Sequence, residues 1–567
     1  MADLEIASAR VTFGYLRKVA LPLFVWSTER WRAYRYVLTL LLLSAAINGV
    51  QVLMSYANRD MMTALATRKS DEFYHYLWSY LLTIGIAIPI GVWFRFSEER
   101  FALLWREWLT NHLLKRYFFR RAYYYLRGED ALDNPDQRIA EDTRNFTGTT
   151  LSLSLIMLNS TITLFAFLGV LVSISWTLVG VLFAYAVIGT VVSMLIGYRL
   201  IGIHYKQYQR EADLRYGLVR IRDNAESIAF FRGEGRERVD LIQRLGRLVQ
   251  NTTALIGWNR NLSFFTSGYN YVALVVPVVV VAPLYLEGKI EFGVIAQAVG
   301  AFAQVLAAVS LIITQFERLS AYAAGVTRLG ALWDAIAADD PTEDDDPEIS
   351  VEEGKILLLD KLTVRPPKSE RKLVEALSLE LPKGKGLLIM GPSGSGKSSI
   401  LRTVAGLWNT GEGAIQRPQL KRMMFLPQKP YLIQASLRAN VLYPQRDAEL
   451  SKESLIETFK QVNLESLANR VDGDFETVLD WSNILSLGEQ QRLSFARVLL
   501  YKPDLVFLDE GSSALDETNE KTLYDLLRNL ACSYVSVGHR SKLREYHDFL
   551  LQITGDGKWE LGVCRPE

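Results

Sequence analysis

Long stretches without a charged residue recur along the N-terminal part of the chain. They are Val37–Tyr56, Leu77–Phe94, Asn145–Tyr198, Asn261–Leu286 and Phe292–Phe316. A helix that crosses a bilayer needs about 20 mostly apolar residues, and the longest stretch suffices for two such helices with a hairpin at Ser175–Trp176. The pattern therefore predicts six spanning helices. Buried helices of a soluble domain are the alternative, but soluble cores rarely repeat uncharged stretches of this length.

The segment before the first stretch, residues 1–36, is rich in arginine and lysine. The apolar run after it is long enough to span a membrane, which argues against a signal peptide. Arg30–Tyr36, with Trp26 and Trp31, is typical of an elbow helix at the membrane interface. We expect residues 1–36 to form a cytoplasmic N-terminus and elbow helix.

Basic residues are distributed unevenly between the predicted spans. Residues 95–144 and 199–260 carry many arginines and lysines, whereas the opposite loops carry only Arg59, Arg68, Lys69 and Lys289. The excess of positive charge in cytoplasmic loops places the basic segments and both termini in the cytoplasm. Because apolar residues recur there at helical spacing, the spanning helices of the predicted membrane domain, 37–335, should continue beyond the bilayer.

Residues 336–353 are dominated by aspartate and glutamate and contain Pro341 and Pro347. Such a segment is typical of a solvated linker between domains. A calcium-binding loop is a poor alternative, since the glycine and ligand spacing of such loops are missing. We expect a second domain at 354–567.

A glycine-rich loop in this second domain follows a short apolar strand predicted at Leu387–Met390. It matches the pattern G-x-x-x-x-G-K-[ST] and comprises Gly391, Pro392, Ser393, Gly394, Ser395, Gly396, Lys397, Ser398 and Ser399. Backbone N–H groups and the positive end of the next helix bind phosphates in such loops. Lys397 should reach the β- and γ-phosphates, and Ser398 should ligate Mg²⁺. The pattern predicts an α/β P-loop ATPase domain.

Two acids end another predicted strand, Leu505–Leu508. At the carboxyl end of a buried strand they would lie beside the phosphate loop. Asp509 is the candidate to hold Mg²⁺, and Glu510 is the candidate general base for the attacking water. A pair of exposed acids without a function is the alternative.

Between these motifs, Leu485–Arg492 reads L-S-L-G-E-Q-Q-R and precedes a helical pattern. It resembles the signature of the ATP-binding cassette (ABC) family. Gln428 in F-L-P-Q, Asp516 in S-S-A-L-D and His539 in S-V-G-H-R resemble the Q-loop, D-loop and switch histidine of that family. The fold that this resemblance implies is a six-helix, exporter-like membrane domain followed by a nucleotide-binding domain.

The resemblance also implies roles for individual residues. In the family, ATP is sandwiched between the phosphate loop of one subunit and the signature of another. Ser486, Gly488, Glu489 and Asp516 are accordingly expected to contact ATP. The resemblance implies that His539 and Gln428 assist Glu510, and that Gln428 joins Ser398 and Asp509 at Mg²⁺.

Three positions depart from the usual family pattern. Leu487 and Glu489 replace the third glycine and the glutamine of the signature, which should alter local contacts but not abolish activity. The family often stacks an aromatic residue on adenine, but Thr363–Pro367 offers none, and Arg365 is the candidate to stack instead.

Motifs in the membrane half, and one further motif, narrow the resemblance to one branch of the ABC family. Asn134–Asp142 and Asn224–Glu234, with Asp480–Ser482 and Gln315–Ser320, resemble the ABCD-type (peroxisomal fatty-acyl) half transporters and their bacterial BacA/YddA-like relatives. The first two segments should be turns that contact the ATPase domain near Gln428; solvated helix caps are the alternative. The resemblance implies a homodimer in a lipid bilayer, with the bacterial inner membrane as the expected location.

The transported solute stays open at this point. The bacterial likeness favours a bulky hydrophilic solute, such as cobalamin or a peptide, and import. Acyl-CoA-like lipids, or a membrane-anchored regulatory ATPase that moves nothing, are the alternatives. The polar residues within the spans each face a cavity or join two helices: Asn48, Gln51, Asn159, Thr161, Thr163, Gln297, Gln304 and Gln315.

Charge and cysteine content argue against a nucleic-acid-binding protein, a disulfide-rich protein and a zinc protein. With 63 basic and 62 acidic residues, the chain lacks the positive excess of a nucleic-acid-binding protein, and no nucleic-acid partner is expected. Two cysteines, Cys532 and Cys564, make neither a disulfide framework nor a zinc site.

Overall fold

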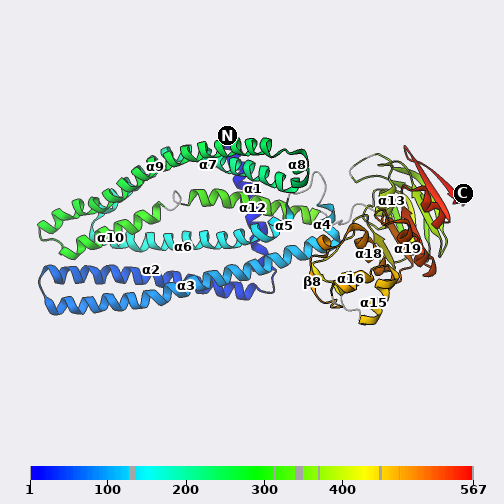
Figure 1. Ribbon diagram of the computed structural model, residues 1–567. Helices are drawn as coiled ribbons and strands as arrows, with labels where there is room; N and C mark the ends of the chain where they lie inside the picture. The colour runs from blue at the N-terminus through cyan, green and yellow to red at the C-terminus, as the bar shows by residue number, and fades with distance from the viewer. Residues whose placement is uncertain are drawn as a thin grey trace. The chain divides into compact units, whose positions relative to one another are not determined.

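The chain forms two compact units, Met1–Asp340 and Pro341–Glu567, which we call the membrane unit and the ATPase unit (Figure 1). The computed structural model describes residues 2–126, 134–310, 315–338, 349–367, 369, 371–445, 450–471 and 473–564.

The membrane unit is helical throughout its described residues (Figure 1). Its helices are α1 (Ala2–Val25), α2 (Arg30–Ala66), α3 (Ser70–Phe118), α4 (Ala122–Tyr125), α5 (Pro135–Gln137), α6 (Thr143–Ile174), α7 (Trp176–Asp223), α8 (Ala225–Phe231), α9 (Glu234–Leu286), α10 (Phe292–Val309) and α12 (Phe316–Ala338), with the short turns η1 (Phe119–Arg121) and η2 (Arg138–Asp142). Within the described residues, six helices are long and apolar enough to cross a membrane, which confirms the predicted number.

The structure has the predicted break at Ser175 between α6 and α7, and helices α7 and α9 are longer than a bilayer requires. Ser175 adopts an extended conformation between α6 and α7, and its hydroxyl accepts a hydrogen bond from the backbone N–H of Thr177. Helix α9 has 53 residues and α7 has 48. At about 1.5 Å per residue, α9 is more than twice as long as the hydrocarbon core of a bilayer.

One prediction about the membrane unit is wrong. Arg30–Tyr36 is not a separate elbow helix, because α2 runs without a break from Arg30 to Ala66. The separate element is α1, whose Val19 and Leu23 are fully buried with Phe101 of α3. Within the described residues, the last candidate span is α10, which lies inside the uncharged stretch Phe292–Phe316.

The predicted linker, 336–353, is too wide at both ends. Helix α12 continues to Ala338, and Ile336 is buried with the other apolar residues of the membrane unit. Residues Ile349–Glu353 form strand β1, which pairs with β5 (Gly411–Arg417). Acidic side chains on the exposed positions of an edge strand resemble a linker in sequence. Residues 339–348 between these elements lie outside the described residues.

The ATPase unit contains a four-stranded sheet of order β1-β5-β2-β3, a six-stranded sheet of order β12-β11-β4-β10-β9-β6 and a two-stranded sheet. The remaining strands are β2 (Leu357–Val364), β3 (Val374–Leu381), β4 (Gly386–Met390), β6 (Met423–Leu426), β7 (Ala435–Ser436), β8 (Val478–Leu479), β9 (Leu505–Asp509), β10 (Ser533–Val537), β11 (Phe549–Gly555) and β12 (Lys558–Val563). The helices are α13 (Lys397–Val404), α14 (Leu437–Leu442), α15 (Lys452–Gln461), α16 (Glu465–Arg470), α17 (Trp481–Ile484), α18 (Leu487–Tyr501) and α19 (Glu517–Asn529), with η3 (Leu420–Arg422) and η4 (Ser541–Tyr546).

The central strands β4, β9 and β10 of the six-stranded sheet are buried on both faces. Successive side chains of a strand point to opposite faces. Leu387 and Ile389 of β4 therefore lie in one apolar cluster, whereas Leu388 lies in another. Strands β11, β4, β10, β9 and β6 are parallel, so their carboxyl ends meet at one edge. Ligands bind at this edge in α/β sheets.

Candidate functional site: a nucleotide site at the sheet edge

Four segments with candidate residues leave the same edge of the six-stranded sheet. The phosphate loop follows β4, Gln428 follows β6, Asp509 and Glu510 end β9, and His539 follows β10. The strand order places β4 beside β10, β10 beside β9 and β9 beside β6. Residues far apart in the sequence are thereby brought into one site.

The phosphate loop, Gly391–Gly396, encloses the side chain of Lys397. The Nζ of Lys397 donates hydrogen bonds to the carbonyl oxygens of Gly391 and Pro392, at 2.9 and 2.7 Å. Burial lowers the pKa of Lys397, an effect that the nearby carboxylates of Glu510 and Asp509 oppose. The ammonium group is thus held where the loop can present it to a phosphate.

Glycine is required at two positions of this loop. A Cβ at Gly391 would lie 2.4 Å from the carbonyl oxygen of Ile553. Gly396, the residue before α13, has a φ of 101°, which side chains rarely adopt. Together they let the backbone turn sharply from β4 into the helix.

Three candidate residues surround Glu510, the first residue after β9. The Nε2 of Gln428 donates to Oε2 of Glu510 at 2.8 Å, and Nε2 of His539 lies 3.4 Å from Oε1. The Oγ of Ser398 donates to Oδ1 of the adjacent Asp509 at 2.9 Å. Glu510 has a φ of 53°, an uncommon backbone conformation that persists only where the surrounding structure holds it.

The donor set suits a magnesium ion. Mg²⁺ prefers oxygen ligands and is typically held by one or two protein groups together with phosphates and water. The hydroxyl of Ser398 and the carboxylate of Asp509 already touch each other, and the amide of Gln428 lies on the neighbouring loop. These residues fit the group that the sequence predicts.

The signature residues form a separate arrangement at the start of α18. Ser486 is the N-cap, and its hydroxyl accepts from the N–H of Glu489 at 3.3 Å. The carboxylate of Glu489 accepts from the N–H of Ser486 at 2.9 Å and pairs with Arg470 at 2.7 Å. Among the described residues, no hydrogen bond joins Ser486, Gly488 or Glu489 to the phosphate loop. The single chain therefore does not bring these predicted ATP contacts to Lys397.

The pKa of the Glu489 carboxyl reflects burial, its hydrogen bonds with Ser486 and its ion pair with Arg470. Burial opposes its charged form, but hydrogen bonds from Ser486 and the ion pair with Arg470 outweigh burial and lower the pKa. The carboxylate, predicted to contact ATP, is engaged in a capping box. Asp516 likewise caps a helix: its Oδ1 accepts from the N–H of Asn519, in the first turn of α19, at 2.8 Å.

Gln491, a residue of α18 with 1% of its surface exposed, contributes to the site although no motif predicts it. Its Nε2 donates to the carbonyl oxygen of Gln428 at 3.0 Å, and its Oε1 accepts from the N–H of Ala514 at 3.1 Å. It thus joins the signature helix to the loops on either side of Glu510. The capping box was visible as S-x-x-E, but nothing in the sequence marks Gln491 as buried.

Arg365, the candidate for adenine stacking, pairs with Glu412 of β5 at 2.7 Å. This ion pair fixes the guanidinium group at the edge of the four-stranded sheet. Stacking on adenine remains a prediction from the sequence.

Six candidate spanning helices and a P-loop unit define an integral membrane protein with a nucleotide-hydrolysing unit. Comparison with known families agrees with both halves. The family described as ABC transporter transmembrane region 2 matches residues 21–286, and the family described as ABC transporter matches residues 374–513.

Three relatives cover most of this chain. An uncharacterized ABC transporter ATP-binding protein of Synechocystis is 44% identical over 94% of this chain and 82% of its own length. ABC transporter D family member 2, chloroplastic, of Arabidopsis thaliana is 37% identical over 95% and 86%. The human lysosomal cobalamin transporter ABCD4 is 32% identical over 82% of each chain.

The chain belongs to the ABC transporter family. It is a half transporter similar to D-family members, with one membrane unit and one ATPase unit, and it couples ATP hydrolysis to transport. The predicted fold class, family and ATPase activity are confirmed.

Proposed function

We propose that two copies of this chain form an ATP-driven transporter in a bacterial inner membrane, with the termini in the cytoplasm. The observation that carries the homodimer is the split of the site within one chain. Lys397, Ser398, Asp509 and Glu510 gather at the sheet edge, whereas among the described residues neither Ser486 nor Gly488 forms a hydrogen bond to any of them. A second chain would supply the signature to complete each ATP site. Native mass measurement of a fully active monomer would contradict this arrangement.

Each residue at the sheet edge has a role in this proposal. Lys397 binds the β- and γ-phosphates of ATP, and Ser398 and Asp509, with Gln428, hold Mg²⁺, which neutralises charge on the phosphates. Glu510 accepts a proton from the attacking water. His539, 3.4 Å from Glu510, orients that carboxylate and the γ-phosphate. Ser486, Gly488 and Asp516 act on the ATP of the partner chain.

Polar residues of the membrane unit divide into two groups. Asn48, Asn159 and Thr163 hydrogen-bond to one another between α2 and α6, with Thr163 donating to Asn48 at 2.5 Å. Gln51, Gln297 and Gln304 instead line a cavity of about 200 Å³. Within the described residues, this second group lines a cavity that a solute could enter.

The cavity favours an uncharged polar solute. All ten of its lining residues are uncharged: Gln51, Met54, Ser55, Asn58, Tyr80, Phe167, Ala296, Gln297, Gly300 and Gln304. Gln297 and Gln304 are seven residues apart on α10, so they share a helix face. The amide nitrogen of Gln297 is buried and has no hydrogen-bond partner among the described residues.

The chemistry of this lining, and not its volume, supports a hydrophilic solute over an acyl-CoA. The phosphates of an acyl-CoA need cationic partners, which this lining lacks, whereas amide side chains match the amides of cobalamin or a peptide. The name of the human relative, a lysosomal cobalamin transporter, points to the same class. We propose cobalamin as the first solute to test and import as the direction.

The test is the ATPase rate of the purified chain in lipid nanodiscs, measured with cobalamin, a mixed peptide pool and an acyl-CoA. Stimulation by cobalamin or peptides supports the proposal. Stimulation by acyl-CoA alone would replace it with a lipid transporter. A rate that no solute changes, together with no transport, would indicate a regulatory ATPase.

A further inference from the structure

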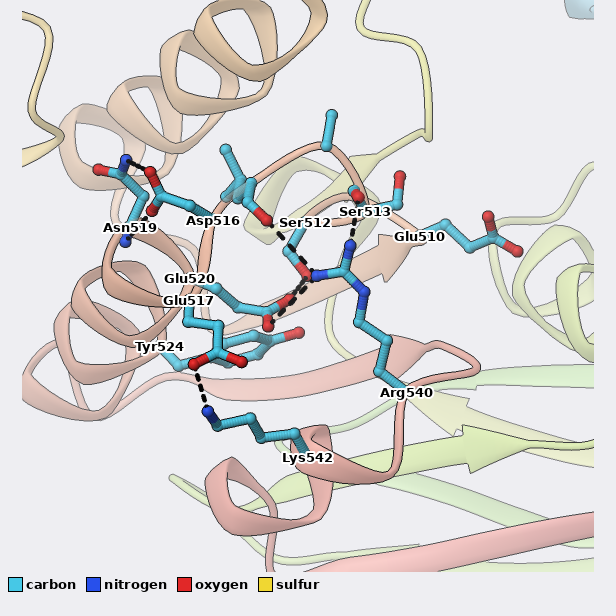
Figure 2. A network of polar contacts seen from close by, with 12 residues as sticks. Glu510, Ser512, Ser513, Asp516, Glu517, Asn519, Glu520, Tyr524, Arg540 and Lys542 are labelled. Atoms are coloured by element: carbon cyan, nitrogen blue, oxygen red, sulfur yellow. Dashed lines mark hydrogen bonds and ion pairs between the residues drawn. The ribbon is translucent and has the colours of Figure 1, made fainter.

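The turn after Glu510 is held from outside its own strand and helix. This turn, Gly511–Asp516, connects β9 to α19, and Figure 2 shows it beside the side chain of Arg540. Arg540 directly follows His539 in the sequence. Contacts of Arg540 therefore join the segment that carries the histidine to the segment that follows the carboxylate.

The guanidinium group of Arg540 has three partners. Its Nη2 donates to the carbonyl oxygen of Ser513 at 2.8 Å, and its Nη1 donates to that of Leu515 at 3.4 Å. Nη1 also lies 3.7 Å from Oε2 of Glu520. The planar fork of an arginine presents donors on separate nitrogens in a fixed geometry, whereas a lysine offers all its donors from one nitrogen atom. The two carbonyl contacts fix the backbone of the turn.

Glu520 secures the same network from below, as Figure 2 shows. Its side chain on α19 is buried, with 2% of its surface exposed, and its Oε1 accepts from the hydroxyl of Ser512 at 2.7 Å. A buried carboxylate is costly unless it is paired. One carboxylate therefore holds both Arg540 and the start of the turn.

We propose that Arg540, anchored by Glu520, is a positioning residue for ATP hydrolysis. The network joins the His539 loop to the turn after Glu510, so the histidine and carboxylate keep the geometry in which they lie 3.4 Å apart. The uncommon backbone conformation of Glu510 requires such support. This inference rests on the proposed role of Glu510 as general base.

A matched control lies within the same network. Lys542 Nζ pairs with Oε2 of Glu517 at 2.6 Å, and both side chains are largely exposed. This pair joins η4, which directly follows Arg540, to the first residue of α19, just after the turn (Figure 2); its hydrogen bond is to the carboxylate of Glu517 and not to a carbonyl group of the turn. Lys542→Ala thus removes a positive charge and an ion pair without releasing the turn.

The experiment measures kcat, KM for ATP and melting temperature of the full chain for Arg540→Ala and Lys542→Ala. Misplacement of a reacting group by about 1 Å can reduce a rate by about 100-fold. We expect kcat of Arg540→Ala to fall by about 10- to 100-fold with KM unchanged, and Lys542→Ala to match wild type. Arg540→Lys should recover only part of the loss, because its single nitrogen cannot take the places of both Nη1 and Nη2.

Three outcomes would overturn the inference. They are a normal kcat for Arg540→Ala, a fall in kcat equal to that of Lys542→Ala, and full recovery of kcat by Arg540→Lys. If Arg540→Ala does not fold, the kcat values of Arg540→Lys and Ser512→Ala are compared with that of Lys542→Ala instead. Glu510→Gln, measured in parallel, separates the two claims: if it stays active, the general-base assignment fails, whereas loss of its activity with a normal Arg540→Ala refutes only the positioning role.

Discussion

The two units of this chain place their polar residues in different ways. In the ATPase unit, a parallel sheet collects short motifs at one edge, so Ser398 and Asp509 touch although they are 111 residues apart. In the membrane unit, polar side chains occur singly along apolar helices. Asn48 and Gln51 are three residues apart on α2, yet one joins two helices and the other lines a cavity.

This difference shows what fixes a functional position in each unit. In the ATPase unit, the direction of the strands and the residues of the turns determine where a functional side chain lies. Both can be recognised in contiguous sequence motifs. In the membrane unit, the rotation of each helix about its axis determines which way a polar side chain points. That rotation depends on packing against several neighbouring helices. The ATPase unit should therefore lose chemistry when a single motif residue changes, whereas the membrane unit should lose recognition or stability, depending on the helix face.

The largest expected effect is that of Glu510→Gln in the ATPase unit. The amide keeps the shape of the side chain but cannot accept a proton, so hydrolysis should fall by about 10²- to 10⁴-fold. ATP binding, measured with a fluorescent analogue, should stay near wild type. Lys397→Ala is the contrasting variant, since it removes a charge that faces the phosphates and should weaken binding itself. Hydrolysis at the wild-type rate by Glu510→Gln would assign the base to another residue.

The link between the units should be sensitive to the turn around α8. Phe230 and Phe231 of this turn are 79% and 86% exposed. Glu226→Ala in this turn should leave basal hydrolysis intact and reduce transport per ATP by about tenfold or more. Glu211→Ala, on α7 outside the turn, is the control. If Glu226 is merely a solvated cap, its variant should lose stability while transport per folded molecule stays normal.

Within the membrane unit, Gln297→Leu and Asn48→Leu should separate recognition from stability. Loss of a hydrogen bond to the solute at Gln297 should raise the KM for transport by about tenfold. Asn48→Leu should lower the stability of the unit by about 1 kcal/mol, because it removes contacts between α2 and α6, and leave KM unchanged. Transport kinetics and thermal unfolding of both variants measure this. The reverse result would exchange the roles of the two residues.

The smallest expected effect is the contribution of Glu489 to stability and its loss at low pH. Its pKa is lowered in the folded chain, so its contribution to stability is present above its unfolded pKa, about 4.3, and is lost as pH falls through the folded value. Glu489→Gln keeps the capping geometry but not the ion pair with Arg470. We expect it to be about 1 kcal/mol less stable at pH 7, with the difference shrinking as the pH falls below about 4.3. A difference that does not change with pH would contradict the assignment.

Much of the fold could be predicted from the sequence because its signals are local. Uncharged stretches gave six spans, and the glycine-rich loop identified the ATPase unit. The ends of elements were less visible, as at Arg30 and Ile349, because neither charge nor its absence marks where a helix or an edge strand begins. Gln491 and Arg540 were missed for a related reason: their contacts arise from the packing of α18 and of the loop after β10.

The central claim is that ATP hydrolysis at the sheet edge moves a polar solute across the bilayer. Its most direct test uses vesicles loaded with labelled cobalamin, with the chain inserted so that the ATPase unit faces the medium. For import, ATP added to the medium should release label from the lumen with the wild-type chain, and not with Glu510→Gln. Cobalamin-stimulated hydrolysis by the wild-type chain without any movement of label would contradict the account.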